Sequence, residues 1–90
     1  MTVTYEEFVF AVETLGLISL TTKEKVKKRY LALSKQHHPD MPEGDVVKFQ
    51  EINRAYEILC FYMDNFRFTF SKEEFEDQFP FGISQKDWIV

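Results

Sequence analysis

The sequence predicts an all-α fold, in which an antiparallel hairpin of two long helices is braced by a short N-terminal helix and a short C-terminal helix. Apolar residues recur at intervals of three and four through most of the chain, as on the buried face of a helix. Only three Gly and three Pro interrupt the 90 residues, which suffice for one domain. Within it we expect a core, residues 1–65, and an aromatic-rich extension, residues 66–90, packed on the same domain.

The first helix is expected from about Tyr5 to Leu15. Thr4 and Glu7 have the spacing of a capping box, in which the hydroxyl and the carboxylate satisfy free backbone N–H groups. Gly16 follows at the position where a left-handed residue commonly ends a helix. One face of this helix is apolar, with Phe8, Val12 and Leu15.

The second helix is expected from Thr22 to His37, with Thr21 and Glu24 as its capping box. Its two faces differ in chemistry: Val26, Tyr30, Leu33 and His37 share one face, and Lys27, Lys28, Leu31 and Lys35 share the other. Residues 21–38 hold six basic side chains and one acid, so this segment carries a charge of +5. The remainder carries −9, and the two sum to the net charge of −4. A positive stripe on an acidic body predicts an acidic partner surface.

Pro39 stops the second helix, and residues 38–45 read as a loop with Pro42 and Gly44 as turn formers. The third helix is expected to start near Asp45 or Val46 and to run to about Met63. Its apolar stripe is the most regular in the chain: Phe49, Ile52, Tyr56, Leu59, Cys60 and Met63. Two long helices with a short link lie antiparallel, so the loop is held exposed at one end of the hairpin.

The C-terminal extension is rich in Phe. Alternation of Phe66, Phe68 and Phe70 predicts an extended connector, and Ser71 with Glu74 predicts a capping box that opens a short fourth helix. Phe75 and Phe79 lie on one face of that helix, Pro80 ends it, and the tail carries Trp88, Ile89 and Val90. We expect residues 66–90 to cover the hairpin as a structural brace. The alternative is an exposed aromatic patch that binds a client or a second protein.

Composition excludes several classes of protein. The single Cys60 excludes an internal disulfide and a multi-cysteine zinc site, and one unpaired thiol favours a reducing, cytoplasmic location. No apolar run reaches the roughly 20 residues of a membrane span, and the N-terminal residues lack the pattern of a signal peptide. The net negative charge disfavours nucleic-acid binding. Without a nucleophile–base pair, a phosphate-binding glycine loop or a metal cluster, we expect no enzyme, no cofactor and no metal.

The most informative motif is His38-Pro39-Asp40, because it follows a basic amphipathic helix and precedes a second long helix. With these flanks, roughly Val9 to Leu59 resembles the J-domain of the DnaJ family. The matching positions are Leu15-Gly16-Leu17, then Val26, Tyr30 and Leu33, then the His-Pro-Asp signature, then Phe49, Ile52, Ala55, Tyr56 and Leu59.

The resemblance implies a co-chaperone module that has no catalytic activity of its own. Such a module docks on the nucleotide-binding domain and linker of a DnaK-type heat-shock chaperone, stimulates its ATP hydrolysis and couples it to clients. In the family, the signature Asp contacts an arginine of the ATPase, and the basic face of the second helix meets an acidic patch. The residues implied in partner binding are His38, Pro39, Asp40, Lys27 and Tyr30, together with Lys28, Lys35 and Leu31 on the same helix.

Three positions depart from the family pattern. Leu31 and Ala32 stand where the family often has two basic residues, and Met41 stands where it commonly has Arg or Lys. These departures favour an alternative function, a J-like interaction or scaffold domain that does not stimulate ATP hydrolysis.

Overall fold

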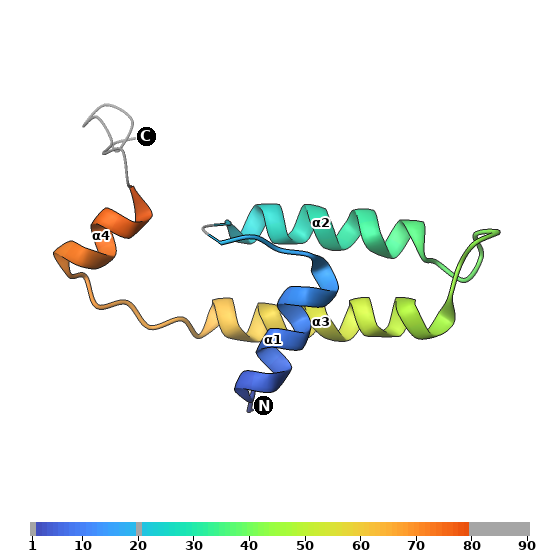
Figure 1. The fold of residues 1–90 in the computed structure, drawn as a ribbon, viewed down its shortest axis with the longest axis horizontal. Helices are drawn as coiled ribbons and strands as arrows, with labels where there is room; N and C mark the ends of the chain where they lie inside the picture. The colour runs from blue at the N-terminus through green and yellow to red at the C-terminus, as the bar shows by residue number, and fades with distance from the viewer. Residues whose placement is uncertain (1, 20, 80–90) are drawn as a thin grey trace.

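The structure is a computed structural model that describes residues 2–19 and 21–79, and over this part of the chain it contains helices and no strand. The four helices are α1 (Tyr5–Leu15), α2 (Lys23–Gln36), α3 (Val46–Asp64) and α4 (Lys72–Gln78). The all-α prediction is confirmed. α2 and α3 run antiparallel as a hairpin, and α1 crosses α3 near the middle of the molecule (Figure 1).

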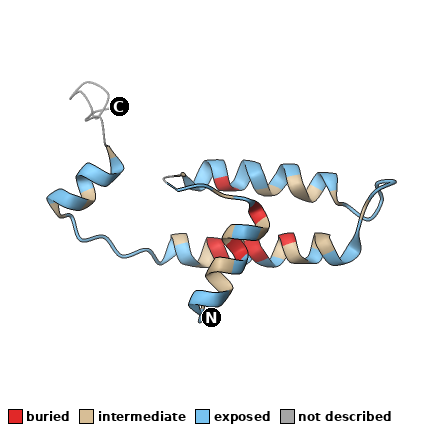
Figure 2. Ribbon diagram, viewed as in Figure 1, coloured by how far each residue is buried: buried red, intermediate tan, exposed pale blue. Residues whose placement is uncertain are grey.

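One apolar core lies where α1, α2 and α3 meet (Figure 2). Its buried residues are Ala11, Leu15, Val26, Ile52, Ala55, Ile58 and Leu59. Ile52 and Leu59 belong to the predicted apolar stripe of α3, whereas Ile58 lies off that stripe and the sequence pattern did not predict its burial. Phe8, Val12, Leu33 and Met63 pack around the core. Burial of this surface provides the main stabilisation of the hairpin and so fixes the loop at its end.

The helix ends follow capping chemistry, with one correction. The Thr4–Glu7 capping box is present, and Gly16 has the left-handed conformation, with φ 62°. At α2 the expected box of Thr21 and Glu24 is wrong, because the cap is Thr22, whose hydroxyl accepts from the Lys25 N–H. The helix begins one residue later than that box requires, and Lys25, the third helical residue, has no acceptor with which to complete a box.

At α4 the expected box is only half formed. The Ser71 hydroxyl accepts from the Glu74 N–H, as expected. The Glu74 carboxylate turns instead to the connector and accepts from the Thr69 N–H at 2.8 Å. The Thr69 hydroxyl and N–H together hold the pKa of Glu74 below its ordinary value.

Polar contacts tie the three core helices together. The Arg29 Nε–H on α2 donates to the Leu15 carbonyl at the end of α1, at 2.9 Å. Lys23 pairs with Asp64, which joins the first residue of α2 to the last residue of α3.

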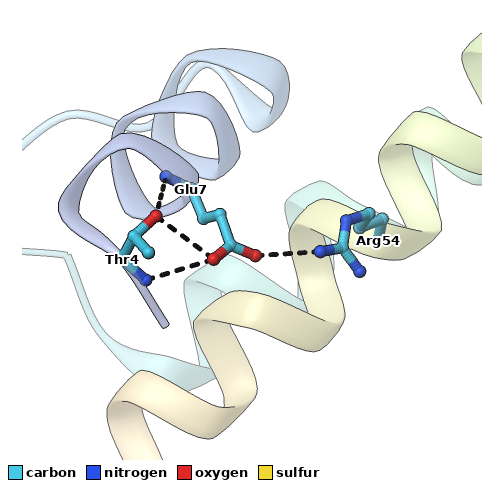
Figure 3. A network of polar contacts seen from close by, with 3 residues as sticks. All are labelled: Thr4, Glu7 and Arg54. Carbon is cyan, nitrogen blue, oxygen red and sulfur yellow. Dashed lines mark hydrogen bonds and ion pairs between the residues drawn. The ribbon is translucent and has the colours of Figure 1, made fainter. Parts of the chain in front are cut away.

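The Glu7 carboxylate lies at the centre of a small network between α1 and α3 (Figure 3). It accepts from the Thr4 N–H at 3.2 Å, from the Thr4 hydroxyl at 3.1 Å and from the Arg54 guanidinium at 2.8 Å. The Thr4 hydrogen bonds, with the nearby Arg54 charge, hold the pKa of Glu7 below its ordinary value.

The C-terminal part differs from the predicted brace. α4 packs against none of the other described helices, no residue of α4 is buried, and Phe75 is 49% exposed. The connector leads away from the end of α3 (Figure 1), and the rings of Phe75 on α4 and of Phe79, its C-cap residue, pack on each other. The radius of gyration, 16.1 Å, accordingly exceeds the about 12 Å typical of a compact chain of this length.

The expected packing of Pro80, Trp88, Ile89 and Val90 lies outside the described residues. The division into a core of residues 1–65 and an extension of residues 66–90 stays a prediction.

Candidate functional site

Two successive turns build the loop of residues 38–45, called the signature loop below. The Met41 N–H donates to the His38 carbonyl, and the Gly44 N–H donates to the Met41 carbonyl, each at 2.9 Å. Pro39 and Pro42 each take the second position of their turn, where a fixed φ suits the geometry. The loop is thus short and hydrogen-bonded.

Both ends of the signature loop are anchored to the hairpin. The Asp45 N–H donates to the carbonyl of His37, which caps the end of α2, at 3.2 Å. The Asp45 carboxylate accepts from the N–H groups of Val47 and Lys48, so the predicted cap of α3 is confirmed. The same residue therefore closes the loop and starts the next helix.

Residue 44 must be glycine because the backbone of His38 and Pro39 passes very close to it. A Cβ added to it would lie 1.9 Å from the His38 carbonyl oxygen and 3.0 Å from the Pro39 Cα. These are backbone atoms, so the chain itself would have to move. Glycine at this position therefore allows the end of the loop to pass directly over the motif.

His38 and Asp40 are held in a defined relation. The Asp40 N–H donates to His38 Nδ1 at 3.1 Å, and the Asp40 carboxylate lies 3.6 Å from the same nitrogen. The His38 ring packs edge-on against Phe49 of α3, with ring centroids 5.1 Å apart. The Asp40 side chain is 91% exposed. The imidazole therefore serves as an anchor, while the carboxylate is presented to solvent as an acceptor.

The predicted basic face of α2 is exposed. Lys27, Lys28 and Lys35 are all exposed, and Leu31 is exposed among them. Lys28 forms an ion pair with Glu24 one turn earlier, at 3.6 Å. The face presents cations around one apolar side chain, which suits a partner surface that is acidic and partly apolar.

Tyr30 is half-buried between α2 and α3. Its hydroxyl donates to the Asn53 side-chain oxygen at 2.8 Å, and its ring stacks on Tyr56 with centroids 4.0 Å apart and planes within 4°. Tyr30 thus joins the two helices and remains partly exposed next to the basic face. Sequence reasoning missed Asn53 and the stacking role of Tyr56, because both depend on how the two helices align.

Of the residues predicted from the sequence, the structure brings His38, Pro39 and Asp40 together on one exposed loop. The basic residues and Leu31 lie along the α2 face that leads to it. No group of three or more His, Cys, Asp or Glu side chains in the described ranges is arranged to hold a metal ion. None of the described helices is long and apolar enough to cross a membrane.

Comparison with known proteins adds a family match over this region. The model of the family described as DnaJ domain matches residues 12–62. The chain is 51% identical over 49 residues to the chaperone protein DnaJ of Lysinibacillus sphaericus (strain C3-41). The aligned segment covers 52% of this chain and 13% of that protein. The chain is also 49% identical over the same length to the chaperone protein DnaJ of Staphylococcus saprophyticus, with the same coverage. No solved structure matches the chain.

Proposed function

This chain belongs to the DnaJ domain family, and from that premise we propose that it binds a DnaK-type chaperone and stimulates its ATP hydrolysis. The observation that carries the proposal is the exposed Asp40 carboxylate, which stands on a backbone fixed by the hydrogen bond from the Asp40 N–H to His38 Nδ1. An acceptor held in place before binding loses little conformational freedom when it meets a guanidinium, so it forms a strong and specific contact.

The basic face of α2 supports the approach of an acidic ATPase surface. Lys27 and Lys35 are exposed, and neither forms an ion pair with a described residue. Opposite charges on two surfaces accelerate their encounter and fix their orientation. We assign Lys27, Lys28, Lys35 and Leu31 to the docking face of α2, Tyr30 to its edge, and His38, Pro39 and Asp40 to the contact that triggers hydrolysis.

The chain aligns with only about an eighth of the length of the curated relatives it matches. Client delivery and a cytoplasmic location are therefore further parts of the proposal. The free Cys60 favours a reducing compartment, and the exposed Phe side chains of residues 66–70 offer a surface for clients.

A second function is favoured by the chemistry beside the loop and on α2. Leu31 and Met41 are both exposed where the family commonly has cations. Loss of these charges favours an interaction or scaffold domain that docks on a DnaK-type chaperone without stimulating hydrolysis.

The test mixes the full chain with a bacterial DnaK-type chaperone under single-turnover conditions and measures both binding and ATP hydrolysis. Stimulation that saturates with the concentration of this chain supports the lead proposal. Binding without stimulation supports the scaffold function. Absence of both at low and physiological salt would contradict both functions.

A further inference from the structure

Six aromatic rings form a continuous series at the end of the hairpin opposite the signature loop. Successive ring centroids are 6.4, 4.7, 5.9, 5.2 and 5.8 Å apart. We call this series the aromatic ladder; its members, in order, are Tyr5, Phe8, Tyr62, Phe66, Phe68 and Phe70. It begins on α1, crosses the end of α3 and follows the connector toward α4.

The aromatic ladder is exposed over most of its length. Phe68 is 64% exposed and Phe70 is 89% exposed, and Tyr5, Tyr62 and Phe66 are exposed as well. Scattered single apolar side chains are ordinary on a protein surface, but a contiguous series of rings indicates a binding surface. α4 packs against none of the other described helices, and these rings stay exposed beside it.

Two apolar hollows flank the centre of the ladder and share Phe8, Tyr62 and Phe66 as a common wall. One has a volume of about 690 Å³ and lies between the start of α1 and the end of α3. The other, about 460 Å³, is lined by Val12, Leu17 and Met63 among others, with Gln78 of α4 at its edge. Concave surfaces lined mainly by apolar side chains are typical of sites that bind apolar ligand groups.

The connector offers backbone groups beside these hollows. It is not helical, and Phe66 and Phe68 alternate with Arg67 as on one face of a strand, up to Phe70, where the backbone is left-handed with φ 56°. Among the described residues, the backbone N–H groups of Arg67 and Phe68 donate no hydrogen bond. An extended polypeptide can pair with such a segment and place alternate side chains into the flanking hollows.

The charge of the residues near the ladder indicates which charge a polypeptide bound there would carry on either side of its apolar part. Residues 66–79 carry two basic and four acidic side chains, a net −2. Glu73, Glu76 and Asp77 of α4 are exposed, Glu76 pairs with Lys72, and Arg67 lines the larger hollow. Residues 80–90 contain one Lys and one Asp and are therefore neutral, so they do not complement this acidic border. A basic segment of another chain complements it better.

We propose that the aromatic ladder binds an extended segment of an unfolded protein, rich in aromatic and aliphatic residues and flanked by Lys or Arg. Its use in delivering clients rests on the proposed function, whereas the binding itself needs no DnaK-type chaperone. The connector, which carries the last rings of the ladder, and the signature loop lie at opposite ends of the hairpin (Figure 1), so one chain can hold a client and engage the ATPase at once.

The test measures fluorescence anisotropy of a short dye-labelled peptide in which Phe and Leu alternate with Ser between Lys flanks, titrated with the full chain. Matched peptides carry Glu flanks, or Ser in place of every Phe and Leu. We expect the Lys-flanked peptide to bind and both matched peptides to bind at least about tenfold more weakly. Equal binding of the Lys-flanked and Glu-flanked peptides would overturn the assigned charge preference.

Variants locate the binding surface. Phe68→Ser with Phe70→Ser changes two exposed rings outside the core and should weaken peptide binding about tenfold or more. Val47→Ser, an equally exposed apolar residue at the other end of α3, is the matched control and should bind as the unmodified chain does. Unchanged binding in the double Phe variant would overturn the proposal.

Two further readouts separate the competing occupants. Trp88 is the single tryptophan, so its emission reports on residues 80–90. A red shift of that emission in the double Phe variant, without peptide binding by the unmodified chain, would assign the ladder to this segment instead. If sedimentation shows that the unmodified chain is a dimer and that the double Phe variant is a monomer, the ladder would be assigned to contact with a second copy of this chain. Asp40→Asn should leave peptide binding intact, which distinguishes failure of this proposal from failure of the ATPase proposal.

Discussion

At the scale of single residues, the shape of the signature loop depends on Gly44 as much as on the His38-Pro39-Asp40 motif. The carbonyl of His38 lies where a Cβ on residue 44 would stand. The motif is evident in the sequence, whereas this contact is not, because it depends on how two consecutive turns fold over each other. The same holds for the hydrogen bond from the Asp40 N–H to His38 Nδ1.

Gly44→Ala should therefore reshape the loop. We expect a loss of about 0.5–3 kcal/mol in urea unfolding, unchanged helical content by circular dichroism, and loss of ATPase stimulation. Gly16→Ala is the control, because φ of 62° at Gly16 strains any other residue at a helix end away from the signature loop. It should lower stability and preserve stimulation under conditions where it is folded. Stimulation by Gly44→Ala at the level of the unmodified chain would show that the loop shape does not matter.

At the scale of the elements, periodicity and caps predict all four helices to within about two residues at each end. The cap of α2 was predicted one residue too early, because two consecutive Thr residues both offer a hydroxyl and only backbone geometry selects one. The polar link between Tyr30 and Asn53 was missed for a related reason, since it depends on the relative register of α2 and α3.

The basic face of α2 should steer association. Lys27→Glu places a carboxylate on this face and should slow association with the ATPase several-fold, with a smaller effect on dissociation and a reduced dependence on salt. Lys72→Glu on α4 makes the same change at an exposed position off this face and serves as the control. Stopped-flow binding at two ionic strengths measures both variants. Equal association rates for the two would argue against steering by α2.

The contact between α1 and α3 should be sensitive to acid. Because the folded state lowers the pKa of Glu7 below its ordinary value of 4.5, the associated stability is present above that pH and is lost as pH falls through the lowered pKa. Glu7→Gln should reduce stability at neutral pH and flatten its decline below about pH 4.5. Glu6→Gln is the control, since Glu6 is exposed and makes no polar contact with described residues. Unfolding midpoints across pH test this, and parallel curves for Glu7→Gln and the unmodified chain would contradict it.

At the scale of the whole molecule, the core is complete without α4. The sequence shows that Phe75 and Phe79 share a face, but periodicity cannot tell which surface, if any, that face covers. The expected brace followed from the number of apolar side chains, whereas the described connector holds α4 away from the hairpin. Position relative to a core depends on the path of the connector, which local sequence does not determine.

Phe75→Ala should therefore cost little stability, under about 1 kcal/mol, because half of that residue is already exposed. Ile58→Ala is the matched change in the core and should cost about 2–5 kcal/mol, since Ile58 is fully buried. Chemical unfolding of both variants gives the comparison. A cost for Phe75→Ala as large as that for Ile58→Ala would mean that α4 packs as a brace.

The central claim, that the signature loop triggers ATP hydrolysis by a DnaK-type chaperone, is tested most directly by Asp40→Asn. The Asp40 side chain is 91% exposed, and its link to His38 runs through the backbone N–H, so the variant should keep its melting temperature and helical content. In single-turnover hydrolysis with saturating chain, we predict that the unmodified chain accelerates ATP cleavage and that Asp40→Asn leaves it at the unstimulated rate. Full stimulation by a folded Asp40→Asn variant would contradict the account.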